Sequence, residues 1–191
     1  PDDSELVIAA SERAGGHRAM YEILEKIVWL DQEPRITEFL VSAPEIARAH
    51  HAGQFVIVIP VEGGERIPLT IADSDAKAGT ISLVFQEVGA STIMLGRLEK
   101  GQKIPHVAGP LGKPTHIEKF DGAVVCVGGG IGIAPIHPIA KAMKAAGNHV
   151  ISILGARSKD LMIYEERMKA ASNEVRITTD DGSYGRKGFV T

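Results

Sequence analysis

The sequence predicts an antiparallel β-barrel followed by a parallel α/β half-sheet. Up to about residue 114, short β-prone segments alternate with turn residues, whereas apolar strands alternate with helical segments after residue 120. A glycine-rich stretch at 127–135 joins the first of these apolar strands to its helix. We therefore divide the chain into a leading segment (1–19), a barrel domain (20–116) and an incomplete α/β domain (117–191).

The composition is that of a folded, mildly acidic protein. The chain has 191 residues, of which 44% are hydrophobic, and a net charge of −3. That charge gives no reason to expect nucleic acid or an anionic membrane as a partner. Cys126, the single cysteine, excludes an internal disulfide and is expected to be an inert core thiol. With no run of 18 apolar residues and no secretory signal, the sequence predicts a cytoplasmic protein.

The first 19 residues do not match the pattern of the rest. They show little periodicity and contain a Gly-Gly-His step before a natural-looking start at Met20. We interpret them as a leader or an added segment. A short helix over residues 5–13 is the alternative.

The barrel prediction depends on five strand-like segments separated by turn residues. They are expected at 21–30, 36–42, 54–59, 66–72 and 80–86. A single helical insertion at 91–98 interrupts them, and the Gly- and Pro-rich segment 109–114 closes the region with turn chemistry. Short strands at this spacing favour a small antiparallel barrel or sandwich.

The α/β prediction depends on three apolar strands and two helices. Strands are expected at 123–127, 149–154 and 175–179, with helices at 139–146 and 161–171 between them. Three parallel strands with two crossovers make the first half of a doubly wound, Rossmann-like sheet. Because such a sheet normally has more strands, we expect the C-terminal part of the parent protein to be missing.

The glycine-rich turn is suited to binding phosphate. Its spacing, Gly130-x-Gly132-x-x-Pro135, resembles a dinucleotide fingerprint but ends in proline rather than glycine. Glycines let backbone N–H groups approach an anion, and the following helix adds the positive end of its dipole. No Gly-Lys-Ser/Thr sequence follows the turn, which excludes a P-loop.

Other catalytic chemistries find no support in the sequence. The histidines lack cysteine or carboxylate partners at ligand spacing, so we expect no metal site. The sequence shows no nucleophile elbow and no paired catalytic acids. Any chemistry must therefore come from a cofactor.

Six motifs in order point to a known family. They are the segments 51–55, 66–71, 88–92, 109–112, 128–135 and 180–185. Together they resemble the ferredoxin–NADP reductase superfamily. Within it, the likeness is greatest to the electron-transfer subunits of dihydroorotate dehydrogenase and to the small subunits of sulfide dehydrogenase or NADH-dependent ferredoxin–NADP reductase. The resemblance implies a Greek-key barrel that binds FAD and a half-sheet that binds NAD(P)H.

The resemblance places the flavin site on Arg66, Pro68, Leu69 and Thr70. In the family pattern an arginine is followed, after any residue, by an aromatic residue and then by serine or threonine. Thr70 takes the hydroxyl position next to flavin N5 and is our catalytic candidate, while Leu69 replaces the aromatic residue. Arg66 is one residue early, so either a bulge re-aims it or backbone groups hold the pyrophosphate. The alternative is that Arg66 is solvated and Thr70 an ordinary strand residue.

Further flavin contacts are implied at the entry to the barrel helix and after it. Gly89, Ser91 and Thr92 are expected to offer N–H groups to the pyrophosphate, with additional contacts at Gly109 and Gly112. A capped helix without a ligand is the alternative.

On the nicotinamide side, the resemblance implies that one set of residues holds the second pyrophosphate. This set is Gly129, Gly130, Gly132 and Pro135. The second strand ends in Arg157 without an acidic residue, so NADPH stays open alongside NADH. Asp181, beside Asp180, lies at the expected carboxyl edge of the sheet. Arg157 as a surface residue and the two aspartates as turn residues are the alternatives.

The implied function is that of a flavoprotein oxidoreductase subunit. NAD(P)H would reduce FAD, and electrons would pass toward a [2Fe–2S] cluster expected only in the missing C-terminal part. The implied partner is a larger catalytic oxidoreductase subunit, with ferredoxin as a further candidate. Two alternatives stay open: a stand-alone flavin reductase, and a non-enzymatic regulatory module that binds a nucleotide.

Overall fold

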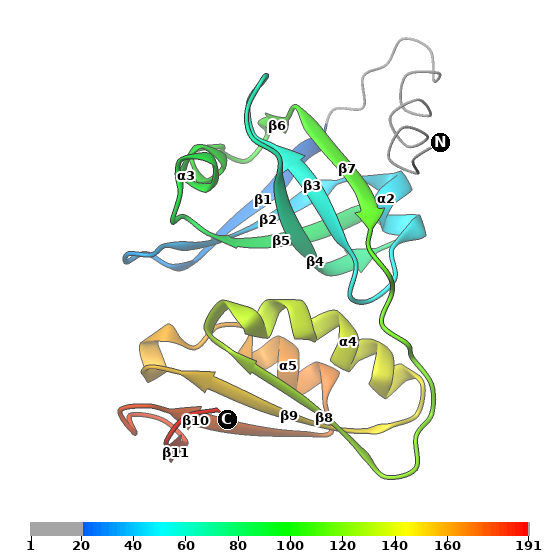
Figure 1. The fold of residues 1–191 in the computed structure, drawn as a ribbon, viewed down its shortest axis with the longest axis vertical. Coiled ribbons are helices and arrows are strands. Elements are labelled where there is room, and N and C mark those ends of the chain that lie inside the picture. Colours follow the sequence, from blue (N-terminus) through cyan, green and yellow to red (C-terminus); the bar gives the residue numbers. More distant parts are fainter. Residues whose placement is uncertain (1–20, 191) are drawn as a thin grey trace.

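The computed structural model describes residues 21–190, so the interpretation of residues 1–19 lies outside the described part. Figure 1 shows a β-barrel stacked on an α/β unit whose helices face the barrel. No helix among the described residues is long and apolar enough to cross a membrane.

The barrel is a nearly closed antiparallel sheet of seven strands in the order β6-β1-β2-β5-β4-β3-β7. The strands are β1 Tyr21–Leu30, β2 Ile36–Ser42, β3 Phe55–Ile59, β4 Ile67–Asp75, β5 Thr80–Gln86, β6 Lys103–Ile104 and β7 His106–Leu111. All five predicted strands are present, with shifts at some ends. The turn predicted at 109–114 is wrong for its first part, because residues 109–111 continue β7, and Leu111 pairs with Phe55 of β3 after a register shift.

The barrel carries two helices, α2 Pro44–Ala49 and α3 Ala90–Gly96. The expectation of a single helical insertion is therefore wrong. Helix α2 begins with Pro44, whose fixed φ suits a first helical turn, and buries Ile46 and Ala47 against the barrel. It is too short to show the apolar periodicity from which a helix is predicted.

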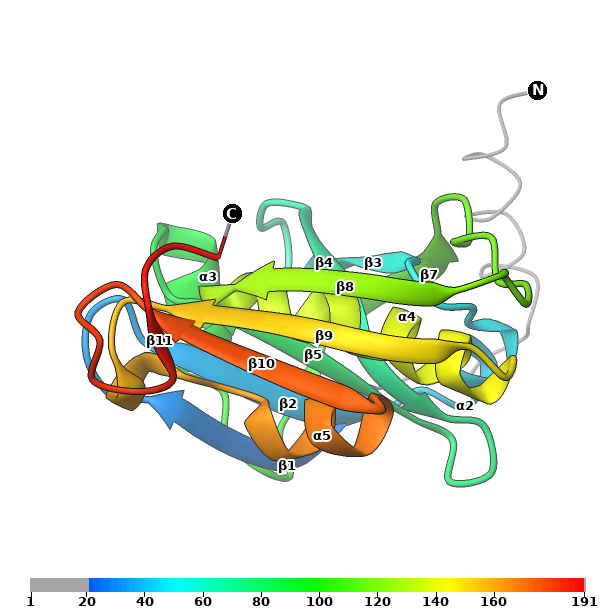
Figure 2. The same cartoon turned by 90° about the horizontal axis from the view of Figure 1, so that it is seen from below.

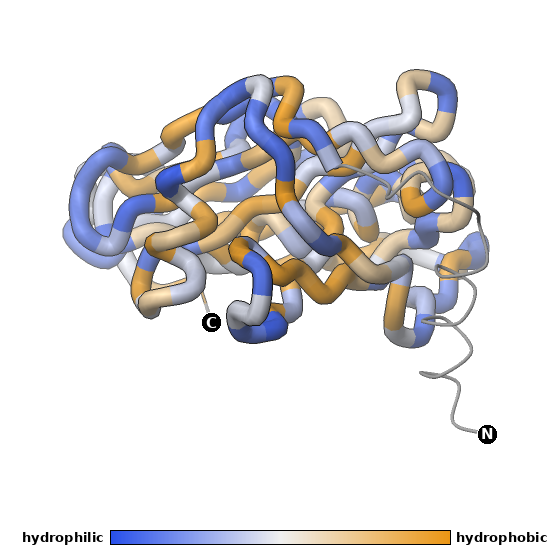
Figure 3. Tube along the Cα trace, turned by 90° about the horizontal axis from the view of Figure 1, so that it is seen from above, coloured by the Kyte–Doolittle hydropathy of each residue, from blue (hydrophilic) through white to orange (hydrophobic). Residues whose placement is uncertain are grey.

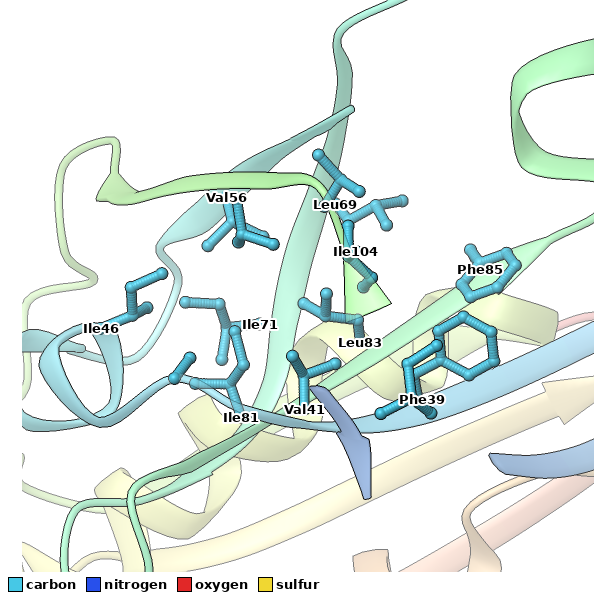
Figure 4. Close-up of a cluster of buried hydrophobic side chains, with 14 of the residues drawn as sticks. Phe39, Val41, Ile46, Val56, Leu69, Ile71, Ile81, Leu83, Phe85 and Ile104 are labelled. Carbon is cyan, nitrogen blue, oxygen red and sulfur yellow. The ribbon is translucent and has the colours of Figure 1, made fainter. Parts of the chain in front are cut away.

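Strand alternation separates the barrel interior from its outer face. Figure 4 shows the interior, where Phe39, Val41, Ile81, Leu83 and their neighbours point toward one another. These four side chains are fully buried. The intervening residues of the strands face outward, and some of them meet the α/β unit.

The α/β unit is a four-stranded parallel sheet in the order β11-β10-β9-β8. Its elements are β8 Ala123–Gly129, η1 Gly130–Gly132, α4 Ile133–Ala145, β9 His149–Ala156, η2 Lys159–Leu161, α5 Glu165–Ala171, β10 Glu174–Thr179 and β11 Arg186–Lys187. Helix α4 begins at Ile133 rather than residue 139, so it contains Pro135 and Pro138. The start of this helix was not predicted, because the two prolines are atypical of a helix interior.

The two helices α4 and α5 lie between the barrel and the sheet (Figure 1). A second apolar cluster joins the units, because Ile36, Ala72 and Val84 of the barrel pack with residues of α4, α5 and the sheet. Figure 3 shows hydrophobic segments inside the trace and hydrophilic ones in its loops. The opposite face of the sheet has no such cover among the described residues (Figure 2).

Candidate functional site

Strand β4 presents Thr70 on the outer face of the barrel. The ladder with β3 runs without a register shift from Ile67 to Thr70, and Thr70 pairs with Phe55. Because Leu69 and Ile71 point into the core, the hydroxyl of half-buried Thr70 points the other way. No bulge within this stretch re-aims Arg66, which is exposed and immediately precedes the strand. Pro68 is exposed on the same face as Thr70.

The segment before β4 lies against the beginning of α3. The Ser91 hydroxyl donates a hydrogen bond to the carboxylate of Glu65, the residue before Arg66. The Thr92 hydroxyl accepts hydrogen bonds from the N–H groups of Val88 (3.2 Å) and Gly89 (3.0 Å), so it caps the helix. The structure thus brings the two predicted parts of the flavin site together and gives both hydroxyls intramolecular partners.

The three glycines predicted to contact the flavin differ in their surroundings. A Cβ atom on Gly89 would meet nothing within 4 Å, so its backbone is open to an approaching group. A Cβ on Gly109 would lie 2.7 Å from Val56, and one on Gly112 would lie 2.8 Å from Phe55. Close packing against β3 therefore accounts for Gly109 and Gly112 without a ligand.

The glycine turn shows the same division between packing and openness. A Cβ on Gly128 would lie 2.8 Å from Ile136 and 3.0 Å from the carbonyl oxygen of Gly132, so Gly128 lets α4 approach β8. Gly130, at φ +55°, and Gly132 have open space where a Cβ would be. Helix α4 has no side-chain hydrogen bond at its N-cap. Open backbone at an uncapped helix N-terminus fits an anionic pyrophosphate.

The remaining predicted nucleotide contacts differ in position along the turn. Gly129 is the last residue of β8 and lies beside Val190, 3.4 Å from where its Cβ would be. Pro135 is the third residue of α4, in the first turn, where a missing N–H costs little. Proline at this position of the motif is therefore compatible with the helix.

Arg157 and Asp181 come together at the carboxyl end of the sheet. The N–H of Asp181 donates to the carbonyl oxygen of Arg157 at 3.2 Å, and the Asp180 N–H donates to that of Ala156 at 3.1 Å. The Asp181 carboxylate accepts from the hydroxyl and N–H of Ser183, and these bonds lower the pKa of Asp181. Asp181 therefore holds a turn, while its carboxylate and the Arg157 side chain are both exposed.

Two contacts tie the predicted flavin strand to the helix of the glycine turn. Nδ1 of buried His137 lies 2.9 Å from the carbonyl oxygen of Ala72, two residues beyond Thr70. Lys141 pairs with Asp73 at 2.8 Å. Strand β4 and helix α4 are thus in direct contact, so the two predicted nucleotide sites belong to neighbouring elements.

A polar cluster between the domains was missed by the sequence analysis. Glu38, on β2, is 2% exposed and accepts hydrogen bonds from Trp29, Tyr164 and Arg167. One signal was present: an acidic residue stands within the apolar segment 36–41. A carboxylate is rarely buried in such a strand unless it has partners.

Metal chemistry finds no site in the described part of the chain. No group of three or more His, Cys, Asp or Glu residues there is placed to hold a metal ion. Cys126 is buried, and burial raises the pKa of its thiol. A thiol of this kind is a poor nucleophile, as the sequence analysis expected.

Comparison with known proteins identifies relatives across most of the chain. The dihydroorotate dehydrogenase B electron transfer subunit homolog of Thermotoga maritima is 43% identical over 176 residues, covering 92% of this chain and 61% of the relative. The corresponding electron transfer subunit of Geobacillus thermodenitrificans is 35% identical over 162 residues, covering 82% and 62%. No family model matches. The chain thus spans about three-fifths of the length of these relatives.

Solved structures share the fold. A structure of the NADH-dependent reduced ferredoxin–NADP oxidoreductase superposes with a TM-score of 0.83 at 40% identity, covering 91% of this chain and 61% of that one. Ferredoxin–NADP⁺ reductase from Plasmodium falciparum, at 15% identity, has a TM-score of 0.65, covers 83% and 68%, and shows the fold alone. The chain is therefore a homologue of the dihydroorotate dehydrogenase B electron transfer subunits and has the fold of the ferredoxin–NADP reductases.

Proposed function

We propose that this chain is the FAD- and NAD(P)H-binding part of an oxidoreductase electron-transfer subunit. The observation that carries the proposal is the contact between β4 and α4. This contact sets the strand of Thr70 beside the helix that follows the glycine turn. FAD, when bound, accepts a hydride equivalent from NAD(P)H and releases electrons one at a time.

The residues of the barrel side are suited to hold the flavin. Thr70 directs a hydroxyl away from the core on the outer face of β4, where it can serve as a hydrogen-bond donor. Arg66 supplies a positive charge next to the beginning of α3, where the backbone of Gly89 is open. A cation beside open backbone is suited to an approaching pyrophosphate.

The residues of the half-sheet side are suited to hold NAD(P)H. The backbone of Gly130 and Gly132 is open at the N-terminus of a helix of 13 residues. Arg157 and Asp181 lie together at the carboxyl ends of β9 and β10, where nucleotides bind in sheets of this type. Strand β9 itself carries no acidic residue and is followed by the exposed Arg157, which leaves both NADH and NADPH as candidates.

The visible spectrum of the purified protein tests the proposal. We expect flavin absorption bands, and bleaching of those bands when NADH or NADPH is added without oxygen. A colourless protein that takes up no added FAD would overturn the proposal and favour a nucleotide-binding regulatory module. Bound flavin that turns over rapidly with free acceptors alone would favour a stand-alone flavin reductase.

The role of Thr70 is tested by Thr70→Val, which removes the hydroxyl and keeps the shape. We expect an unchanged amount of bound FAD, a rate of flavin reduction lower by about tenfold, and a shifted flavin potential. Ser42→Val, a change at a half-buried strand residue of the same barrel, is the matched control. If the reduction rate and the potential both stay the same in Thr70→Val, Thr70 has no part in the flavin chemistry.

The names of the relatives support a proposal about partners. Because two of them are named as electron transfer subunits, we propose that this chain acts with a larger catalytic subunit and a [2Fe–2S] cluster carried outside the described residues. Ferredoxin is the further candidate acceptor. We place the protein in the cytoplasm, where NAD(P)H is made and used.

A further inference from the structure

A carboxylate is buried at the junction of the two domains. Glu38 lies on the outer face of β2, in line with Ile36, which belongs to the apolar cluster shared by both domains. Its side chain is 2% exposed. Moving a carboxylate out of water into such a place is costly unless hydrogen bonds and an opposite charge compensate.

The compensation comes mostly from the other domain. Trp29, on the neighbouring strand β1, donates its indole N–H to one Glu38 oxygen at 2.8 Å. The second oxygen accepts from the Tyr164 hydroxyl at 2.9 Å and from the Arg167 guanidinium at 2.7 Å. Tyr164 and Arg167 belong to the half-sheet domain. The carboxylate is therefore fully paired only while the domains are docked.

Aromatic contacts fix the direction of these donors. The Arg167 guanidinium lies 4.5 Å from the centre of the Tyr164 ring and 5.4 Å from that of Trp29. The Tyr164 and Trp29 ring centres are 5.2 Å apart. Planar guanidinium groups favour such stacking, which leaves the N–H groups free to bond the carboxylate.

The backbone conformation of Tyr164 shows that its surroundings hold this residue firmly in place. Tyr164 has φ +61° and is the only non-glycine residue with positive φ in the described part of the chain. A bulky side chain disfavours this conformation, which persists where the surroundings over-determine it. Here Tyr164 is 1% exposed, and its ring packs edge-to-face with the His137 ring, with the two ring centres 5.5 Å apart.

We propose that Glu38, Tyr164 and Arg167 form an interdomain lock that fixes the half-sheet against the barrel, which makes Glu38 a positioning residue. An apolar trio of similar size would hold the domains as firmly, because buried ion pairs add little net stability. The polar arrangement adds direction, because the bonds form in one relative orientation. This inference rests on the proposed function, in which that orientation sets the approach of NAD(P)H to FAD.

Two variants of the purified holoprotein test the lock. Glu38→Gln keeps the shape but removes the charge that Arg167 faces, and Tyr164→Phe removes one hydroxyl while keeping the ring. Hydrogen exchange measured by mass spectrometry is expected to rise about tenfold in α5 and the β1–β2 region, with no change in β5. Flavin reduction by NAD(P)H should slow by about tenfold or more, with unchanged FAD content and NAD(P)H affinity.

Lys169→Met is the matched control. Lys169 lies on α5 and pairs at 2.7 Å with Glu165 and Glu166 on the same helix, so its replacement breaks two ion pairs within α5 and none to the barrel. In the Lys169→Met variant, hydrogen exchange in the β1–β2 region and the rate of flavin reduction should equal those of the unmodified protein.

Several outcomes would overturn the lock. One is unchanged hydrogen exchange and an unchanged rate of flavin reduction in both test variants. Another is a uniform rise in exchange through both domains, because that indicates a general loss of stability. If Glu38→Gln does not fold, Tyr164→Phe alone decides. If the unmodified protein binds no FAD, the proposed function fails, while the exchange pattern still decides whether the lock exists.

Discussion

The barrel and the half-sheet bury their apolar residues in different ways. The barrel encloses its own core, in which Phe39, Leu83 and Ile104 are fully buried. The half-sheet covers one face with α4 and α5, which in turn pack on the barrel, and exposes apolar side chains on the other. Val125 is 54% exposed, Val127 44% and Phe189 76%. The barrel thus has an enclosed core of its own, whereas the half-sheet buries its apolar residues largely against its helices and the barrel.

The edges of the two sheets show the same contrast. The barrel ends in β6 and β7, which almost meet, while β8 ends the parallel sheet without a further partner among the described residues. Strand β8 is an apolar run of the kind found in the middle of parallel sheets, which are usually covered on both faces. At the described end of the chain, Val190 already packs over Gly155, where a Cβ would lie 2.5 Å away.

Deleting one phenylalanine ring in each region is the most direct test of this difference in burial. Phe39→Ala should lower the free energy of unfolding by about 3–5 kcal/mol, because it leaves a cavity beside Phe85. Phe189→Ala, the same change on the open side, should alter it by less than about 0.5 kcal/mol. Urea denaturation of both variants gives the values. Similar losses of unfolding free energy in the two variants would mean that Phe189 is buried in solution.

The glycines sharpen the comparison within the half-sheet. Gly128→Ala should cost about 1–3 kcal/mol of unfolding free energy, because its Cβ would meet Ile136 and the backbone of Gly132. Gly132→Ala adds a Cβ in open space and should leave stability within about 0.5 kcal/mol. Its effect should appear in NAD(P)H titrations, as affinity weaker by about tenfold. If Gly132→Ala binds NAD(P)H normally, the turn does not hold the pyrophosphate.

High pH should lower the free energy of unfolding, because Tyr164 is buried between the barrel and the half-sheet. Burial, followed by the neighbouring Glu38 carboxylate, raises the pKa of Tyr164 far above its usual range. Unfolded tyrosine ionises near pH 10, so the stabilisation from this group is complete below about pH 10 and is lost as the pH rises further. Tyr164 alone should remove up to about 1.4 kcal/mol of stability per pH unit there.

Urea denaturation at several pH values between about 9 and 11 checks this dependence. Tyr164→Phe should lose stability less steeply than the unmodified protein, while Tyr21 and Tyr184 contribute equally to both. Parallel curves for the two proteins would show that Tyr164 does not stay un-ionised in the folded state.

The sequence predicted the elements better than their contacts. Turn residues and alternation were enough for the five main barrel strands, but β7 was missed because Gly109 and Pro110 are typical turn residues. The start of α4 was missed because Pro135 and Pro138 are atypical of a helix. Local patterns weigh each residue against its neighbours, so a strand or helix held together by distant packing escapes them.

The same limit applies to the site. The glycine turn and the segment around Thr70 were recognisable because their residues are contiguous. Glu38 and Arg167, by contrast, are 129 positions apart and meet only when the domains dock. A pattern within one strand marks Glu38 as unusual but does not name its partner.

The smallest expected effect tests the open face itself. Val127→Thr adds a hydroxyl on the exposed face of β8, where water can bond it, so the unfolding free energy should change by less than about 0.5 kcal/mol. Val150→Thr makes the same change on the covered face of β9, where Val150 is fully buried, and should cost about 1–3 kcal/mol. Because an exposed apolar face promotes association, Val127→Thr should also lower self-association in sedimentation experiments. A large cost for Val127→Thr would show that the face is covered in solution, and the half-sheet would then be as closed as the barrel.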